Sequence, residues 1–329
     1  MASTAWSFED SDRELFTREL ESFVPPRIYD AHAHLYRRNF FQGPPPEAVA
    51  KGPDADWQSY LEHASALTPG RQISGLFFGF PNAAVDVEAS NQFVAAEARR
   101  DPRSRAEMLV TPGMDPEYIR ETVRREGFAG LKCYHVYASE TPTFQAAIPS
   151  YLPEEQVRIA HEENLSITLH MVRATAMADP LNQEVLRTYG RRYPNARFIL
   201  AHAARGFNPH HTVAGIGALR GYGNFWCDTS AVTDGGALEA IVRTLGVSRL
   251  LYGSDFPVSH LRGRCVAIGD SFLWLSPENT RFEAAYADLR PAPIGIESLR
   301  VLKLACMNLN LGDAEIEKIF FGNAAELFS

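Results

Sequence analysis

The sequence has few cysteines and no long apolar run. Its four cysteines, Cys133, Cys227, Cys265 and Cys306, are scattered without a C-x-x-C pair, which disfavours a disulfide framework or a zinc knuckle and suits free thiols in a reducing compartment. No uninterrupted apolar stretch approaches the roughly 18 residues of a membrane span, and the first residues lack the basic and apolar regions of a signal peptide. We therefore expect a cytoplasmic protein without a membrane partner.

The chain also has no excess of positive charge. With 32 Lys and Arg against 40 Asp and Glu, its formal net charge is −8. Binding to nucleic acid or to an anionic membrane needs a basic face, so we expect neither, and a small molecule is the expected partner. The 329 residues, 45% of them hydrophobic, suffice for one large core. No internal repeat divides them, so we expect a single domain over residues 1–329.

Short β-rich runs alternate with helical patterns from one end of the chain to the other. Eight runs are expected to be strands: residues 27–34, 72–80, 104–113, 127–135, 165–172, 196–204, 224–230 and 249–258. Several helical stretches between them open with Asp or Pro and close on Gly, Asn or Pro. Eight β-then-α units whose strands are apolar on both faces predict an α/β fold, a (β/α)8 TIM barrel.

Three segments exceed a minimal barrel. Residues 1–26 are expected to be a helical extension, because Ser11 and Glu14 form a capping-box pattern ahead of an apolar face. Residues 35–71 and 259–295 follow the first and the eighth strand, and loops after barrel strands lie at the C-terminal face, where active sites are built. We therefore expect both inserted loops to act as lids or substrate walls.

The same two inserts allow a second use. Their aromatic residues suit a substrate wall and equally an interface with a second copy of the chain. These residues are Trp57, Phe272, Trp274 and Tyr286. A homodimer is therefore an open alternative to a lid, and the sequence does not choose between them.

Five side chains of metal-ligand type fall at the C-terminal ends of expected strands: His32, His34, His170, His202 and Asp255. In an extended strand, His32 and His34 project to the same side. A lone strand histidine is more often a hydrogen-bonded core residue, but five such groups at one barrel mouth would be costly to bury without a partner. A divalent metal is the natural partner, with zinc preferred and manganese or iron as alternatives.

Five further histidines are expected outside this group. They lie in helices or loops, and we interpret them as solvated surface residues: His63, His161, His210, His211 and His260. His210 and His211 follow the sixth expected strand closely enough to reach the mouth, yet the surface assignment is the simpler one.

These motifs resemble the amidohydrolase superfamily. "YDAHAH", "LKCYH", "ITLH", "ILAHAA", "LLYGSDFPV" and the terminal "IEKIFFGNAAELF" are similar to its branch of metal-dependent hydrolases and decarboxylases, which includes aminocarboxymuconate-semialdehyde decarboxylase and pyrone-dicarboxylate lactonase. H-x-H combined with G-S-D-x-P is the most specific part of a resemblance that covers nearly the whole chain. It implies a distorted (β/α)8 barrel and a hydrolytic water, or a protonating acid, at one or two divalent metals.

The residues and the resemblance together suggest individual roles. One divalent ion held by His32, His34, His170 and Asp255 would lower the pKa of its bound water from 15.7 towards about 7. Asp255 would take the proton from that water and pass it to the leaving group, while His202 orients the water or polarises the attacked carbonyl. In the mononuclear members that the sequence resembles, the histidine of the sixth strand is catalytic and not a ligand, and we follow them.

Lys132 leaves the metal count open. It stands where binuclear members of the superfamily carry a carboxylated lysine between two metals, so a binuclear site is the minority alternative. Otherwise Lys132 supplies a cation for a substrate carboxylate. Arg173 and Arg205 follow ligand positions, and each would either hold such a carboxylate bidentately or pair with a neighbouring Asp or Glu.

Three functions are consistent with these patterns. Hydrolysis of a small, carboxylate-bearing lactone, ester or amide is preferred, because "YGSDFPV" resembles the hydrolase form of the strand-eight motif. Non-oxidative decarboxylation of an aromatic or unsaturated carboxylic acid on the same metal site is the alternative. A catalytically silent binding protein comes third, because the ligand set is intact.

Overall fold

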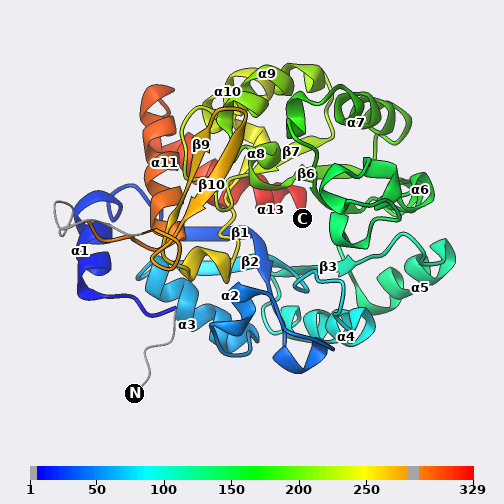
Figure 1. Cartoon of the computed structure of the whole chain (residues 1–329), viewed down its shortest axis with the longest axis horizontal. Coiled ribbons are helices and arrows are strands. Elements are labelled where there is room, and N and C mark those ends of the chain that lie inside the picture. Colours follow the sequence, from blue (N-terminus) through cyan, green and yellow to red (C-terminus); the bar gives the residue numbers. More distant parts are fainter. Residues whose placement is uncertain (1–5, 281–288) are drawn as a thin grey trace.

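Eight parallel strands form the centre of the molecule, with helices around them (Figure 1). The computed structural model describes residues 6–280 and 289–329. The strands are β1 Arg27–His34, β2 Gln72–Phe78, β3 Arg105–Leu109, β4 Gly130–Tyr134, β5 Ser166–His170, β6 Arg197–Leu200, β7 Phe225–Asp228 and β8 Leu250–Leu251. They pair in this order, each parallel to the next. The predicted (β/α)8 barrel is confirmed.

The barrel closes irregularly, between β1 and the residues that follow β8. Because β8 is only two residues long, the closing hydrogen bonds come from the chain beyond it. The backbone N–H of His34 donates to Phe256 O at 2.9 Å, and that of Asp255 donates to His32 O at 2.8 Å. The β1–β2 register also shifts around His32, as at a β-bulge. This distorted closure brings the tips of β1 and β8 side by side.

Eight helices follow the strands one by one: α3 Trp57–Leu67, α4 Val87–Ala98, α5 Pro116–Glu126, α6 Glu154–Glu162, α7 Pro180–Arg192, α9 Pro209–Gly215, α10 Ala237–Leu245 and α11 Ile294–Asn308. Their ends follow from the sequence. At α5, Asp115 accepts from the N–H of Glu117 at 2.9 Å, Pro116 takes the first helical position, and Gly127 ends the helix at φ +72°, a conformation that favours glycine. Among the described residues, no helix is long and apolar enough to cross a membrane.

Short helices complete the chain: α1 Asp10–Glu19, α2 Glu47–Ala50, α8 Ala201–Arg205, α12 Asp313–Glu317 and α13 Asn323–Leu327. The helix α1 confirms a helical N-terminal extension, but the predicted Ser11–Glu14 capping box is wrong. The helix begins one residue earlier than Ser11, and Asp12 accepts from the N–H of Glu9 at 2.8 Å. Asp12 also pairs with Arg262 at 2.5 Å, so charge pairing with the segment after β8 fixes this start.

The segment 35–71 is only partly an insert, so its interpretation as a lid throughout is wrong. Its second half is α3, the helix of the first β/α unit. Trp57 is buried and packs on Tyr60 and Phe77, at ring-centroid distances of 5.8 and 5.5 Å. Trp57 is therefore a core residue and not part of a substrate wall, because α3 needs an apolar face against β2.

The segment after β8 forms a hairpin of β9 Arg264–Ile268 and β10 Ser271–Leu275, drawn in orange beside α11 in Figure 1. The Asn208 amide donates to Gly269 O at 2.9 Å and to Ser271 O at 3.0 Å. Phe272 and Trp274 both contact Phe207, at 5.1 and 5.3 Å between ring centroids. The hairpin thus lies over the residues that follow β6, at the C-terminal face. Tyr286 lies outside the described residues.

Candidate active site

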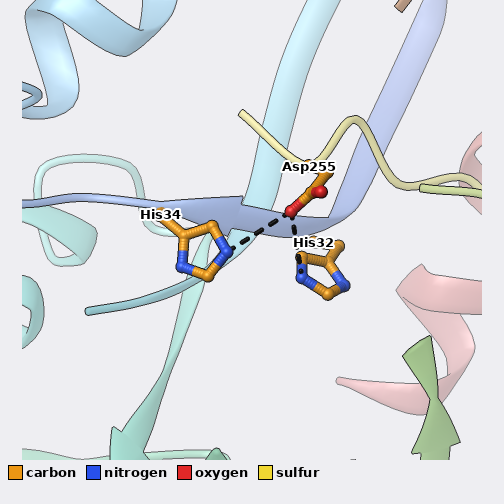
Figure 2. Close-up of side chains that lie close together, drawn as sticks. All are labelled: His32, His34 and Asp255. Carbon is orange, nitrogen blue, oxygen red and sulfur yellow. Dashed lines mark ion pairs between the residues drawn. The ribbon is translucent and has the colours of Figure 1, made fainter. Parts of the chain in front are cut away.

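Three of the predicted ligands converge at the closure between β1 and β8. The Nε2 atoms of His32 and His34 each lie 3.4 Å from Oδ1 of Asp255 (Figure 2). One ligand atom from each residue lies within 4.8 Å of the other two, and all three side chains are buried. This spacing suits a shared cation, because an ion at coordination distance from each atom would lie between them.

The second ring nitrogen of each β1 histidine is already bonded to the protein. His32 Nδ1 lies 2.8 Å from Oδ2 of Asp228, and His34 Nδ1 lies 3.1 Å from the carbonyl oxygen of Gly79. A carboxylate and a carbonyl only accept, so both Nδ1 atoms carry the proton and both Nε2 lone pairs face Asp255. Burial lowers the pKa of both histidines, which keeps the rings neutral. Neutral imidazoles with a fixed tautomer are what a divalent metal requires.

The motif Gly253-Ser254-Asp255 has one structural task at each position. A Cβ atom at Gly253 would lie 2.9 Å from Cβ of His32, so only glycine lets the chain pass this close to β1. The Ser254 hydroxyl donates to Oδ2 of Asp30 at 2.5 Å. Asp255 itself has a left-handed backbone, at φ +61°, which turns its carboxylate toward the histidines. Burial alone would raise the Asp255 pKa, but His202, His34 and His32 together hold it below its ordinary value.

His202 reaches the same centre from a turn and not from a strand. The sixth strand ends at Leu200, so the predicted strand over 196–204 is too long. The next turn holds four left-handed residues, His202 to Arg205, at φ between +52° and +59°. The His202 ring lies 4.9 Å from the His32 ring between centroids. Its Nδ1 lies 3.0 Å from the Ser230 carbonyl oxygen, so Nδ1 carries the proton and Nε2 an available lone pair.

His170 ends β5 and lies beside this group. Its ring stacks on Tyr134 at 4.5 Å and meets the His202 ring edge-on at 5.0 Å between centroids. Its buried Nδ1 has no hydrogen-bond partner among the described residues, and burial holds its pKa well below the ordinary value. His170 is not part of the tight group that His32, His34 and Asp255 form.

Lys132 points into the barrel and is completely buried. Its Nζ lies 3.4 Å from His32 Nε2 and 4.2 Å from the centre of the Phe78 ring. Burial lowers its pKa. The amine is therefore next to the nitrogen of His32 that faces Asp255, below the mouth of the barrel.

The two predicted anion-binding arginines differ in their partners. Arg173 forms an ion pair with Asp179 at 2.8 Å, and its side chain is 22% exposed. Arg205 is 9% exposed and donates to the Arg173 carbonyl at 2.9 Å, with its guanidinium 5.3 Å from the centre of the Phe272 ring. No carboxylate within the described residues pairs with Arg205. From the sequence, an ion pair and a role in substrate binding were equally expected for Arg173 and Arg205. In the structure, Arg173 has an acidic partner, whereas Arg205 has none among the described residues.

Two of the five histidines expected at the surface are buried, so that interpretation is wrong for His211 and His260. The Nε2 of His260 lies 3.0 Å from the carbonyl oxygen of His63, and its ring packs against Phe256 at 5.2 Å. His260 is buried because the loop after β8, to which it belongs, folds back onto α3. The sequence predicts a loop after β8 but does not show which helix that loop packs against.

Asp228 and Ser230 are functional candidates that the sequence analysis missed. Asp228 ends β7 and is completely buried; it contacts His32 and, through its other oxygen, the backbone of His202. The signal was present, because "CDTS" puts a carboxylate at the tip of an expected barrel strand, as Asp255 is. The rule that selected the other five residues applies equally to Asp228.

Comparison with protein families assigns the chain. The family model described as Amidohydrolase matches residues 29–329, so the chain belongs to the amidohydrolase family. This confirms the resemblance drawn from the strand-tip motifs.

The individual proteins that the chain resembles have low sequence identity to it. L-fucono-1,5-lactonase from Burkholderia ambifaria is 32% identical over 123 residues, which cover 32% of this chain and 41% of the lactonase, so the match spans about two fifths of that relative. An amidohydrolase from Burkholderia multivorans solved with bound zinc has a TM-score of 0.58 at 15% identity, covering 92% of this chain and 98% of that one. A 2,6-dihydroxybenzoate decarboxylase solved with 2,6-dihydroxybenzoate has a TM-score of 0.57 at 14% identity, covering 93% and 99%. At such identities the two structures show the shared fold alone.

Proposed function

We propose that the protein is a metal-dependent hydrolase that opens a small, carboxylate-bearing lactone, ester or amide with an activated water. The observation that carries the proposal is the convergence of His32, His34 and Asp255, with both Nε2 lone pairs aimed at one carboxylate oxygen. The partial match to a lactonase supports hydrolysis.

We further propose a cytoplasmic location for the protein, which its four free, buried thiols support.

We propose that His32, His34 and Asp255 hold one divalent ion, with His170 as the fourth ligand. Two neutral imidazoles and a carboxylate with a depressed pKa suit zinc, with manganese or iron as alternatives; the zinc-bound neighbour supports zinc. When bound, the ion would supply Lewis acidity that makes water reactive at neutral pH. Lys132 beside His32 keeps a carboxylated, binuclear form as the minority alternative.

The protein's own groups would then handle the proton and the substrate. Asp255 would accept a proton from the attacking water and deliver it to the oxygen or nitrogen that leaves the carbonyl carbon. The Nε2 lone pair of His202 suits accepting a hydrogen bond from that water, which favours orientation of water over polarisation of the carbonyl. Buried Arg205, without an acidic partner in the described chain, is better suited to a substrate carboxylate than the paired Arg173.

Decarboxylation on the same site is the second candidate. The specific support is the decarboxylase among the structural neighbours, together with the buried guanidinium of Arg205, which has no acidic partner in the part of the chain that the structure describes. The two functions differ in their products, because hydrolysis releases an acid and a leaving group, whereas decarboxylation releases carbon dioxide and replaces the C–C bond with C–H.

One experiment tests metal and reaction together. Protein purified without chelators would be analysed for metals, then screened against lactones, N-acyl amino acids and aromatic carboxylic acids, with acid release and carbon dioxide recorded in parallel. We expect about one zinc per chain and acid release from a carboxylate-bearing lactone, ester or amide. Carbon dioxide release would favour the second candidate, and two ions with a modified Lys132 would favour the binuclear site. A gel-filtration mass from the same preparation would decide between monomer and homodimer.

A further inference from the structure

Asp228 is a buried carboxylate surrounded by hydrogen-bond donors. Its Oδ2 accepts from His32 Nδ1 at 2.8 Å. Its Oδ1 accepts from the backbone N–H of His202 at 2.8 Å, from the backbone N–H of Ser230 at 3.1 Å and from the Ser230 hydroxyl. A completely buried charge would be costly without such partners, so this set of donors keeps the group ionised.

Ser230 extends this arrangement to the second ring. Its hydroxyl donates to Asp228, so the same oxygen accepts from His202 Nδ1, which lies 2.9 Å away. The Ser230 carbonyl oxygen is a second acceptor for that nitrogen, at 3.0 Å. The local sequence builds this contact, because an aspartate whose side chain accepts from the N–H two residues later forms an Asx-turn. One β7 tip therefore reaches both His32 and His202.

We propose that Asp228, acting with Ser230, is the shared positioning residue that fixes the orientation and tautomer of both His32 and His202. A carboxylate that only accepts leaves His32 as the Nδ1–H form, with Nε2 toward Asp255. The Ser230 hydroxyl and carbonyl do the same for His202. The ring geometry stands on its own, while the catalytic value of orienting His202 rests on the proposed function.

A competing use of the same atoms is a second metal site. One ligand atom each from His32, His202 and Asp228 lies within 4.8 Å of the other two. However, Nδ1 of His32 is already at hydrogen-bond distance from Asp228, which assigns this contact to a proton and not to an ion. The two uses predict different results when Asp228 is neutralised.

The first test is nitrogen NMR of ¹⁵N-histidine-labelled, metal-free protein, with signals assigned by their loss in His32→Gln and His202→Gln. We expect both His32 and His202 as Nδ1–H tautomers in the wild-type protein. This readout needs neither a substrate nor a variant of Asp228. An Nε2–H tautomer at either ring would overturn the proposal.

The second test is Asp228→Asn, which keeps the shape but can turn an amide N–H toward His32. We expect the His32 tautomer to change and zinc affinity, measured by competition with a chromophoric chelator, to fall about 10- to 100-fold. Glu107→Gln is the matched control: Glu107 is also a completely buried carboxylate, on β3, and it accepts from the Ser166 hydroxyl. Its zinc affinity should equal that of wild type.

The outcomes separate this inference from the proposed function. Wild-type zinc affinity and tautomers in a folded Asp228→Asn would overturn the positioning role. Two ions in the wild type and one in Asp228→Asn would also overturn it and make Asp228 a ligand. Reduced zinc affinity and a changed His32 tautomer, with no turnover of any substrate by the wild type, would support the positioning role and contradict the proposed hydrolase. If Asp228→Asn does not fold, the wild-type tautomers still decide.

Discussion

The histidines of β1 and the histidine after β6 reach one centre from backbones of different kinds. His32 and His34 stand on a strand, where their i, i+2 spacing directs both side chains to one side. His202 stands in a run of four left-handed residues, which for non-glycine residues cost about 1 kcal/mol or more each. Such a conformation persists only where its surroundings hold it. At this site the hydrogen bond from the His202 N–H to Asp228 is part of that support.

The difference suggests a division of work. The His32 and His34 pair suits the binding of an ion, because the strand β1 keeps the distance between the two side chains constant. The His202 ring is fixed by a turn, by Asp228 at the end of β7 and by Ser230 just after it. It can therefore be oriented independently of the ion, as a proton-handling group needs.

Replacing His32 with alanine should abolish stoichiometric metal binding. The change removes one Nε2 from the group around Asp255 and leaves Asp228 buried without its His32 partner. Metal analysis after dialysis would measure it, with His210→Ala as the control because His210 is exposed. A His32→Ala protein that retains a full equivalent of metal would show that the ion binds elsewhere.

Replacing His202 with asparagine should leave most of the metal and reduce turnover by on the order of 10² or more, the range for losing a proton-transfer group or oxyanion stabiliser. The asparagine amide can still donate to the Ser230 carbonyl, but Nε2 is gone. Metal content and kcat would be measured on the same preparation. Equal metal loss in His202→Asn and His32→Ala would show that His202 is also a metal ligand and would favour a binuclear site. Full activity of His202→Asn would show that His202 has no role in the mechanism.

The two arginines provide a matched pair on the His202 side. Arg205→Met should raise KM for a carboxylate-bearing substrate about 10- to 100-fold, the range for losing a hydrogen bond between charged groups. Arg173→Met should change KM little, because Arg173 already pairs with Asp179. KM for an uncharged analogue should be unaffected in both variants. Equal effects of the two variants on the charged substrate would contradict the assignment of Arg205.

The β1–β8 side of the site was accessible to sequence reasoning, and the β6–β7 side only in part. His32, His34 and Asp255 follow from H-x-H spacing and from the carboxyl ends of parallel strands. The position of His202 does not, because its strand ends two residues earlier and the left-handed turn leaves no distinctive residue type in "AHAARG". Asp228 could have been found by the same strand-tip rule.

The fold shows a similar contrast. Alternating β and α patterns gave the eight strands, since each pattern reflects local burial. The start of α1 and the burial of His260 were predicted wrongly, because both depend on contacts between segments far apart along the chain. Asp12 of α1 pairs with Arg262 after β8, and the His260 ring packs against Phe8 before α1. The half of segment 35–71 that forms α3 was missed for another reason: the sequence shows Trp57 and Tyr60, but only the structure shows that both pack on Phe77 of β2.

The smallest expected effect on metal binding and turnover concerns the barrel interior below the mouth, where Glu107 accepts from the Ser166 hydroxyl at 2.7 Å. Burial raises the Glu107 pKa from 4.5 to about 7. Because the folded protein then binds this proton more tightly than the unfolded chain, its contribution to stability is full below about pH 4.5 and is lost as the pH rises to about 7. The free energy of unfolding of metal-free wild type, minus that of Glu107→Gln, should therefore fall by on the order of 3 kcal/mol across this window and then level off. Urea unfolding at a series of pH values would measure it, with the exposed Glu121→Gln as control; a difference independent of pH would mean that Glu107 stays ionised beneath the site.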